Sequence, residues 1–248
     1  MESIGIRLGI SFFLYQDVTA TVTTYCPSGG KTPGKVGTMK ITLLGATGNI
    51  GSRILREALD RGHEVTAIVR NPDKLTVKHE NLHVLKGDAL EPETLRNPLK
   101  SAEAVISALS PAFTDQEPFL AANRNLMALV REEKTPRLVV VGGASSLYVE
   151  PGVRLFDTGV MPKEWTPYLN AHFDLLATLK ESGLPWTYFS PAATIEAGER
   201  TGKYRKGGTD LIKDAEGNSR ITYEDYAVAL LDELEKPERI GVQFTAAY

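Results

Sequence analysis

The chain lacks the residues that build disulfide frameworks and metal centres. Its 248 residues include one cysteine, Cys26, and four histidines that show no metal-ligand spacing, namely His63, His79, His83 and His172. One cysteine cannot form an intramolecular disulfide or supply a zinc or iron–sulfur site. We therefore expect no bound metal and a reducing, cytoplasmic compartment.

Long apolar runs and an excess of one charge are also missing. No stretch reaches the roughly 18 apolar residues that a membrane-spanning helix needs. With 28 Lys and Arg against 31 Asp and Glu, the net charge is −3. A chain so near neutrality is not built to bind nucleic-acid phosphates or an anionic membrane surface. We therefore expect a small-molecule partner, no nucleic acid and no membrane, for a monomer or a homodimer.

Residues 1–38 differ in composition from the rest. An apolar run at Ile4–Tyr15 is followed by Pro27–Thr38, which is rich in Gly, Pro, Ser and Lys like a linker. A secretory signal peptide is the weaker alternative because Arg7 interrupts the apolar run. We expect residues 1–38 to be a disordered or non-native extension, and residues 39–248 to form one domain.

From residue 39 onward, short apolar runs alternate with helical patterns. The expected strands are Ile41–Leu44, Glu64–Val69, Leu82–Leu85, Ala104–Ala108, Leu138–Val141 and Trp186–Phe189. The expected helices are Ile50–Ala58, Pro92–Leu99, Phe119–Glu132, Pro167–Ser182 after a Thr166 cap, and a last one from a Thr222 cap to about Glu235. Strands without polar alternation are typical of a parallel sheet covered on both faces. The pattern therefore predicts an α/β fold with a doubly wound parallel sheet and helices on both faces.

A glycine-rich turn joins the first expected strand to the first expected helix. Its sequence is Gly-Ala-Thr-Gly-Asn-Ile-Gly over residues 45–51. In this context the first glycine permits a tight turn, the second lets the backbone approach a pyrophosphate, and the third lets the helix pack closely. The N–H groups and the helix dipole then bind the diphosphate. The predicted cofactor contacts here are Gly45, Thr47, Gly48, Asn49, Ile50 and Gly51.

Arg70 stands at the end of the second strand, nineteen residues after Gly51. An acidic residue there would bind the ribose hydroxyls of NAD, whereas a guanidinium suits the 2′-phosphate of NADP. A solvent-facing arginine at a strand end is the other interpretation. We therefore expect NADP(H) as the preferred cofactor, with NAD(H) as the alternative.

The pattern Gly-Ala-Thr-Gly-x-x-Gly resembles that of atypical and extended short-chain dehydrogenases/reductases. With the segments after the later strands, residues 39–248 are similar to small bacterial NAD(P)H-binding proteins provisionally described as NADH-flavin reductases, which are related to biliverdin IX-beta/flavin reductases. The resemblance implies one Rossmann-type NAD(P)-binding domain with a small C-terminal substrate region. It also implies cofactor contacts at Asp88, Ala89, Ser107, Ala108, Leu109, Gly142, Gly143, Ser190 and Pro191.

The Tyr-x-x-x-Lys pair of typical short-chain dehydrogenases is incomplete in this chain. Tyr168 has the right spacing, but His172 stands where Lys is expected. Residues four apart share a helix face, yet a histidine with an ordinary pKa near 6.5 cannot supply the permanent charge of lysine. The family pattern places the active-site serine at Ser146, with Ser145 competing. The predicted catalytic residues are Ser146, His172 and Tyr168, although a surface tyrosine and a hydrogen-bonded histidine are the structural alternatives.

Flavin reduction suits a site without a strong general acid, because the nicotinamide and the flavin carry the chemistry. Our first hypothesis is an NAD(P)H-dependent reductase of a flavin, a quinone or a similar planar acceptor, with flavin as a substrate. The second is an NADP(H)-sensing binding protein without turnover. The third, an epimerase or dehydratase of a nucleotide sugar, is disfavoured by the missing lysine. A basic loop with Arg200, Lys203, Arg205 and Lys206 either lines an anionic acceptor or is simply solvated.

Overall fold

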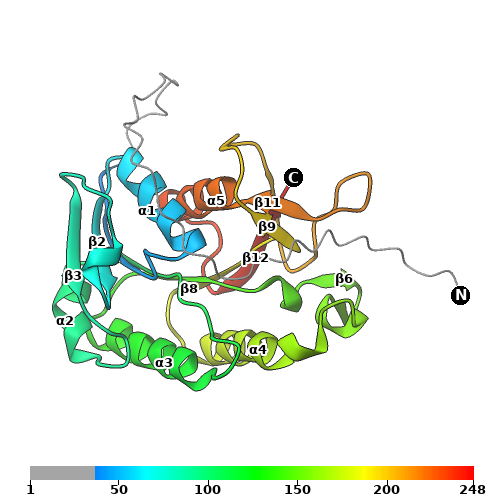
Figure 1. Cartoon of the computed structure of the whole chain (residues 1–248), viewed down its shortest axis with the longest axis horizontal. Helices are drawn as coiled ribbons and strands as arrows, with labels where there is room; N and C mark the ends of the chain where they lie inside the picture. The colour runs from blue at the N-terminus through cyan, green and yellow to red at the C-terminus, as the bar shows by residue number, and fades with distance from the viewer. Residues whose placement is uncertain (1–36) are drawn as a thin grey trace, which may run out of the picture.

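The computed structural model describes residues 37–248, so the predicted extension at 1–38 lies outside the described residues except for its last two positions. The described chain folds around an eight-stranded sheet with the order β10-β12-β8-β5-β4-β1-β2-β3 (Figure 1). Neighbouring strands pair in parallel, except that the edge strand β10 pairs antiparallel with β12. The predicted parallel α/β sheet is therefore confirmed, with one antiparallel strand added at its edge.

The sheet strands are short. They are β1 (Lys40–Leu44), β2 (Glu64–Val69), β3 (Leu82–Lys86), β4 (Ala104–Ser107), β5 (Leu138–Val141), β8 (Trp186–Ser190), β10 (Arg205–Gly207) and β12 (Val242–Ala247). The helices are α1 (Asn49–Asp60), α2 (Glu93–Lys100), α3 (Glu117–Glu132), α4 (Thr166–Glu181) and α5 (Tyr223–Glu235). Among the described residues, no helix is both long and apolar enough to cross a bilayer.

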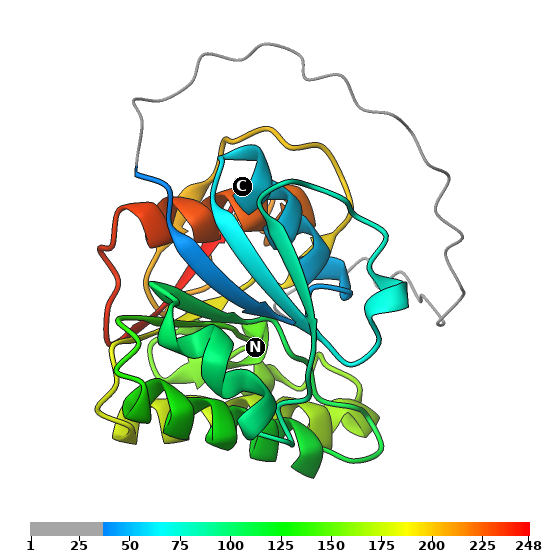
Figure 2. The same ribbon diagram turned by 90° about the vertical axis from the view of Figure 1, so that its left-hand side faces the viewer.

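Helices cover both faces of the sheet. Helices α1 and α5 lie on one face, and α2, α3 and α4 lie on the other (Figures 1 and 2). Successive strand residues point to opposite faces, so Leu43 packs in the core under α1 and α5, whereas Leu44 packs with α2, α3 and α4. Two buried faces explain why the strands are apolar throughout rather than alternating.

Two helix starts test the capping predictions. The Thr222 hydroxyl accepts the N–H of Asp225 at 3.1 Å, which confirms the predicted N-cap of α5. The predicted cap at Thr166 is wrong. A 3-10 turn at Lys163–Trp165 runs directly into α4, so Thr166 already has helical backbone angles and Trp165 takes the cap position.

The strand β12 was not predicted. It begins directly after Gly241 and alternates polar with apolar residues, with Gln243 and Thr245 on one face and Phe244 on the other. Because the other sheet strands were identified as continuous apolar runs, this alternating segment was not recognised as a strand. Its parallel pairing with β8 brings Gln243 opposite Tyr188 and Thr245 opposite Ser190, at the edge of the sheet where the candidate site lies.

The strand order reverses beside β1, which pairs with β2 on one side and β4 on the other. In open α/β sheets, ligands bind beyond the carboxyl ends of the strands at such a reversal. Four short strands lie outside the main sheet: β6 (Tyr148–Glu150) pairs antiparallel with β7 (Val153–Arg154) after β5, and β9 (Thr194–Glu196), after β8, pairs in parallel with β11 (Arg220–Thr222). We therefore expect the ligand site among the loops at the carboxyl ends of the strands.

Candidate functional site

The glycine turn after β1 lies directly against the end of β4. Gly48 donates its N–H to the carbonyl of Gly45 at 3.0 Å, which closes the turn. Gly45 has φ of +82°, the left-handed region that favours glycine, and a Cβ there would lie 2.3 Å from the carbonyl oxygen of Ala108. The first predicted glycine role, a tight turn, thus follows from the positive φ of Gly45 and from its contact with Ala108 directly after β4.

The start of α1 is open to a ligand. Gly48 is the N-cap and is exposed, and it has no side chain to cap the helix. The first N–H groups of a helix have no partner within the helix, so those of Asn49, Ile50 and Gly51 can bind an anion. A Cβ at Gly51 would lie 2.1 Å from the carbonyl oxygen of Gly45 and 3.3 Å from the Cβ of Ala108. Only glycine lets α1 begin this close to the turn.

The ends of β3 and β4 are held by local hydrogen bonds. Ser107 donates its hydroxyl to Oδ1 of Asn123 at 2.9 Å, so this side chain is bound to α3. Ala108 and Leu109 are half-buried beside the glycine turn. After β3, the Asp88 carboxylate accepts the N–H of Leu90 at 3.0 Å. Ala89 is buried, and its carbonyl accepts from Asn125 Nδ2 at 2.9 Å.

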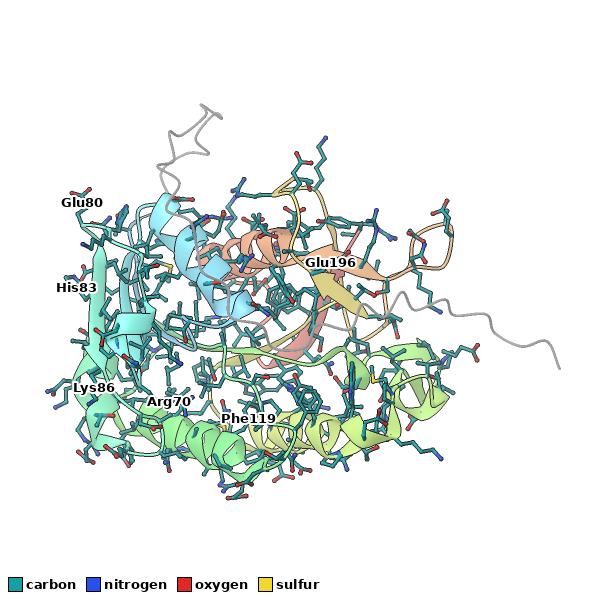
Figure 3. The ribbon with its side chains drawn as sticks, viewed as in Figure 1. Arg70, Glu80, His83, Lys86, Phe119 and Glu196 are labelled. Atoms are coloured by element: carbon teal, nitrogen blue, oxygen red, sulfur yellow. The ribbon has the colours of Figure 1, made fainter. Side chains whose placement is uncertain are left out.

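Arg70 is exposed directly after β2. Val69 pairs with Lys86, and Figure 3 shows Arg70 near Lys86 where β2 and β3 end. The carboxyl ends of parallel strands share one edge of the sheet, so Arg70 stands on the same edge as the glycine turn. The position fits the predicted contact with the far end of a bound dinucleotide.

His172 is deeply buried on α4, with 4% of its surface exposed. Its ring packs against Phe119, with ring centroids 5.4 Å apart, and its Nδ1 lies 3.4 Å from the hydroxyl of Tyr188. Burial lowers the pKa of His172 to about 4. The imidazole is therefore neutral near pH 7 and cannot replace the charged lysine of the usual Tyr-Lys pair.

Tyr168 lies one helical turn before His172, and their rings are 5.2 Å apart, as expected for a shared helix face. Its hydroxyl is 3.2 Å from Ser110 Oγ, and its ring stacks on Phe113 at 4.8 Å. Burial raises the pKa of Tyr168 above its ordinary value. A tyrosine that acts as a proton donor beside lysine has the opposite shift, so Tyr168 is not acidified here.

A buried hydrogen-bond network joins the predicted site residues at the ends of β5 and β8. Gln243 donates through Nε2 to Ser146 Oγ at 2.8 Å and to Ser190 Oγ at 2.9 Å. Ser146 in turn donates to the carbonyl of Gly143 at 3.3 Å. The N–H of Gly143 donates to the Tyr188 hydroxyl at 3.1 Å, and that hydroxyl reaches His172. Gln243 and Tyr188 are thus the site residues that sequence analysis missed.

The two glycines after β5 make room for this network. A Cβ at Gly142 would lie 2.2 Å from the Tyr188 ring, and a Cβ at Gly143 would lie 3.2 Å from Cγ of His172. Their small size is therefore explained by packing, and their contact with a cofactor stays a prediction, as it does for Pro191, which is buried after β8. Ser145 is buried, and its hydroxyl has no hydrogen-bond partner within residues 37–248. Ser146, not Ser145, belongs to the network.

The basic loop at residues 197–206 is largely fastened to the protein itself. Arg200 binds both carboxylate oxygens of Glu57 on α1, at 2.7 and 2.8 Å. Burial would raise the pKa of Glu57, but Arg200 and Arg61 together hold it below its ordinary value. Arg205 donates to the carbonyl of Lys213 at 2.8 Å. Arg200 and Arg205 are thus each bound within the protein, and contact of this loop with an anionic acceptor stays a prediction.

Comparison with known proteins agrees with this geometry. The profile of the NAD(P)H-binding family matches residues 45–237. The uncharacterized protein YwnB of Bacillus subtilis is 42% identical over 211 residues, which cover 84% of this chain and 97% of that protein. A Bacteroides thetaiotaomicron structure, provisionally described as an epimerase, has a TM-score of 0.80 at 41% identity and covers 86% of this chain and 98% of its own.

A Streptococcus pneumoniae structure, provisionally described as an NADH-flavin reductase, has a TM-score of 0.76 at 36% identity. The match covers 84% of this chain and 99% of that one. The glycine turn at residues 45–51 lies within the part of the chain that the family profile matches, and the two solved structures share the fold that contains it. The chain belongs to the NAD(P)H-binding family, with the Rossmann-type fold of atypical short-chain dehydrogenases/reductases.

Proposed function

We propose that this protein is an NAD(P)H-dependent reductase that passes a hydride to a flavin, a quinone or a similar planar acceptor. One observation carries the proposal. The network of hydroxyls, amide and imidazole at the ends of β5 and β8 contains neither a carboxylate nor a lysine, and its histidine is neutral because burial lowers the pKa of His172 to about 4. Such a site offers hydrogen bonds rather than a strong acid.

The residues at the carboxyl edge fit NADP(H). The uncapped start of α1 would hold the pyrophosphate through the N–H groups of residues 49–51, and Gly48 leaves that approach free of a side chain. Arg70 would bind the 2′-phosphate, because a guanidinium matches phosphate geometry. Asp88 and Ala89 would border the adenine. When bound, the reduced cofactor supplies a hydride at this edge.

The protein side chains would then orient the acceptor and exclude water. A planar acceptor such as a flavin stabilises its own added charge by delocalisation, so it needs hydrogen bonds and a solvent proton rather than a dedicated acid. Alcohol and ketone chemistry is less suited, because burial raises the pKa of Tyr168 and no lysine stands beside it. Without an acidified tyrosine and its lysine, epimerase activity, which the description of the Bacteroides protein suggests, is also less suited to this site.

The decisive experiment follows NADPH oxidation by absorbance, with the full chain and with FMN, riboflavin or a small quinone in turn. We expect turnover well above the enzyme-free rate. Ser146→Ala should lower it about tenfold, as expected for one lost hydrogen bond. Ser145→Ala is the matched control, because the neighbouring hydroxyl is buried outside the network.

The alternative function is an NADP(H)-sensing protein without turnover. The neutral His172 and the unacidified Tyr168 are also compatible with a site that only binds the nucleotide. Tight NADPH binding with no oxidation by any of the three acceptors would refute the reductase and favour the sensor. Equal activities of the Ser146→Ala and Ser145→Ala variants would remove the network from the reaction.

A further inference from the structure

Gln243 occupies an unusual place for a polar side chain. It comes from β12, the strand next to β8, and only 8% of its surface is exposed. Both N–H bonds of its amide nitrogen are used, one on Ser146 Oγ at 2.8 Å and one on Ser190 Oγ at 2.9 Å. Ser190 is fully buried and holds the amide in place. Of the two serines, only Ser146 retains any exposure, at 5% of its surface, so it is the serine that a ligand can reach.

The direction of these hydrogen bonds controls the Ser146 hydroxyl. A serine hydroxyl has one proton to donate and two lone pairs to accept with. Gln243 occupies a lone pair, and an amide nitrogen cannot accept, so the Ser146 proton must point elsewhere. Its protein acceptor is the carbonyl of Gly143 at 3.3 Å, which is long for an O–H···O hydrogen bond. The proton is therefore easily turned toward a better acceptor.

We infer that Gln243 is a positioning residue that fixes Ser146 as a hydrogen-bond donor toward the planar acceptor. The inference rests on the proposed function, in which this acceptor lies beside Ser146. Its carbonyl oxygens and ring nitrogens are hydrogen-bond acceptors, and they gain negative charge as the acceptor takes up the hydride and its two electrons. The proton that completes the reduction comes from solvent, and Ser146 keeps its own.

The test reverses the direction of the hydrogen bond between residue 243 and Ser146 while keeping the size of the side chain. In Gln243→Glu, a carboxylate of the same size can only accept, so the Ser146 hydroxyl donates to Glu and is lost to the acceptor. We expect kcat with riboflavin to fall about tenfold, while the Kd for NADPH, measured by nucleotide fluorescence, stays within about twofold. Riboflavin is the probe because it carries no phosphate that a new carboxylate would repel.

A pH series separates this effect from a general structural defect. Burial raises the pKa of a carboxyl group, and a protonated Glu can donate to Ser146 again. The kcat of Gln243→Glu relative to the wild type should therefore rise as the pH is lowered from 8 to 5. A ratio that does not change with pH would overturn the inference.

Gln243→Met serves if the Glu variant does not fold. It removes the hydrogen bonds and should lower kcat, but it should have no further effect in a Ser146→Ala background, because Gln243 acts through that serine. Additive losses would overturn the inference. Thr245→Val is the matched control, since Thr245 lies two residues further along the same face of β12 and its buried hydroxyl has no partner among the described residues. It should behave as wild type.

Riboflavin binding tests the role of Gln243 even if the protein does not catalyse the reduction. Absence of turnover by the wild type refutes the reductase. Riboflavin affinity in the presence of NADP⁺, measured by quenching of flavin fluorescence, then decides on Gln243. About tenfold weaker binding by Gln243→Glu than by Thr245→Val supports the positioning role. Equal affinity, or no riboflavin binding by the wild type, overturns it.

Discussion

Replacing Gly51 by alanine should damage the fold, although alanine favours a helix. Gly51 lies in the first turn of α1, where alanine normally gains about 1 kcal/mol over glycine. Its Cβ would lie 2.1 Å from the carbonyl oxygen of Gly45 and 2.8 Å from the carbonyl carbon of the same residue. Both atoms belong to the backbone, so no side-chain rotation relieves the contact.

The magnitude follows from two opposing effects. Overpacking costs about 1–3 kcal/mol, and a contact with fixed backbone this short belongs at the upper end. Subtracting the helix gain leaves a net loss of about 2 kcal/mol in the free energy of unfolding. For a domain of this size, that corresponds to a decrease of roughly 4–8 °C in Tm.

Gly48→Ser is the control for this prediction. The Cβ of a residue at position 48 would have its nearest neighbour at 3.3 Å, and the backbone there is extended at φ −81° and ψ 169°. Serine is a favoured N-cap, so the Tm should be unchanged. NADPH binding should nevertheless weaken, because the new side chain occupies the approach to the N–H groups of α1.

Thermal unfolding and NADPH titration of both variants check the reasoning. The Gly51→Ala variant should lose stability and binding together, and the Gly48→Ser variant should lose binding alone. A Gly51→Ala protein with wild-type Tm would refute the argument that glycine is required for the packing of α1 on the turn. A Gly48→Ser protein with wild-type NADPH affinity would place the pyrophosphate elsewhere.

Three further predictions address cofactor choice, pH and the loop after β9. Arg70→Glu should weaken NADPH binding at least tenfold while changing NADH little, and equal losses in titrations would remove Arg70 from the 2′-phosphate role. The pKa of His172 in the folded protein is about 4, below the ordinary 6.5, so on acidification the unfolded chain binds the proton first. The free energy of unfolding is therefore unaffected by this histidine above pH 6.5. It falls by about 3 kcal/mol as the pH is lowered to 4. Urea unfolding of wild type and His172→Gln at pH 7 and 4.5 should show this difference, and equal pH slopes would contradict it. Asp225 accepts the N–H groups of Thr201 and Gly202 at 2.8 and 2.7 Å, so Asp225→Ala should speed amide hydrogen exchange at both, whereas unchanged exchange would show that other contacts hold the loop.

The glycine turn, the five helices, the strands β1–β5 and β8 and the cap of α5 could all be predicted from sequence. Each depends on residues close together in the chain, such as Thr222 and Asp225. The start of α4 was mispredicted because the preceding 3-10 turn supplies backbone geometry that Thr166 alone does not indicate. The strand β12 was missed because Gln243 and Thr245 interrupt its apolar pattern, and of these two only Gln243 binds the network.

For the candidate site, too, some residues could be predicted from sequence, whereas their surroundings could not. By sequence, Ser146, His172 and Tyr168 could be named, and the missing lysine already argued against alcohol dehydrogenation. The neutral state of His172 follows from burial beneath Phe119 and Tyr188, which no local pattern reveals. The same is true of the ion pair between Arg200 and Glu57, because Glu57 is 143 residues away in the sequence.

The sequence by itself determined the α/β class and the glycine turn, because apolar periodicity and glycine spacing act over a few residues. Only the tertiary structure decided which groups work together at the carboxyl edge. Gln243 meets Ser146 across 97 residues and Ser190 across 53, through the parallel pairing of β12 with β8. Such hydrogen bonds depend on strand register, and register is set by packing of the whole sheet rather than by any short segment.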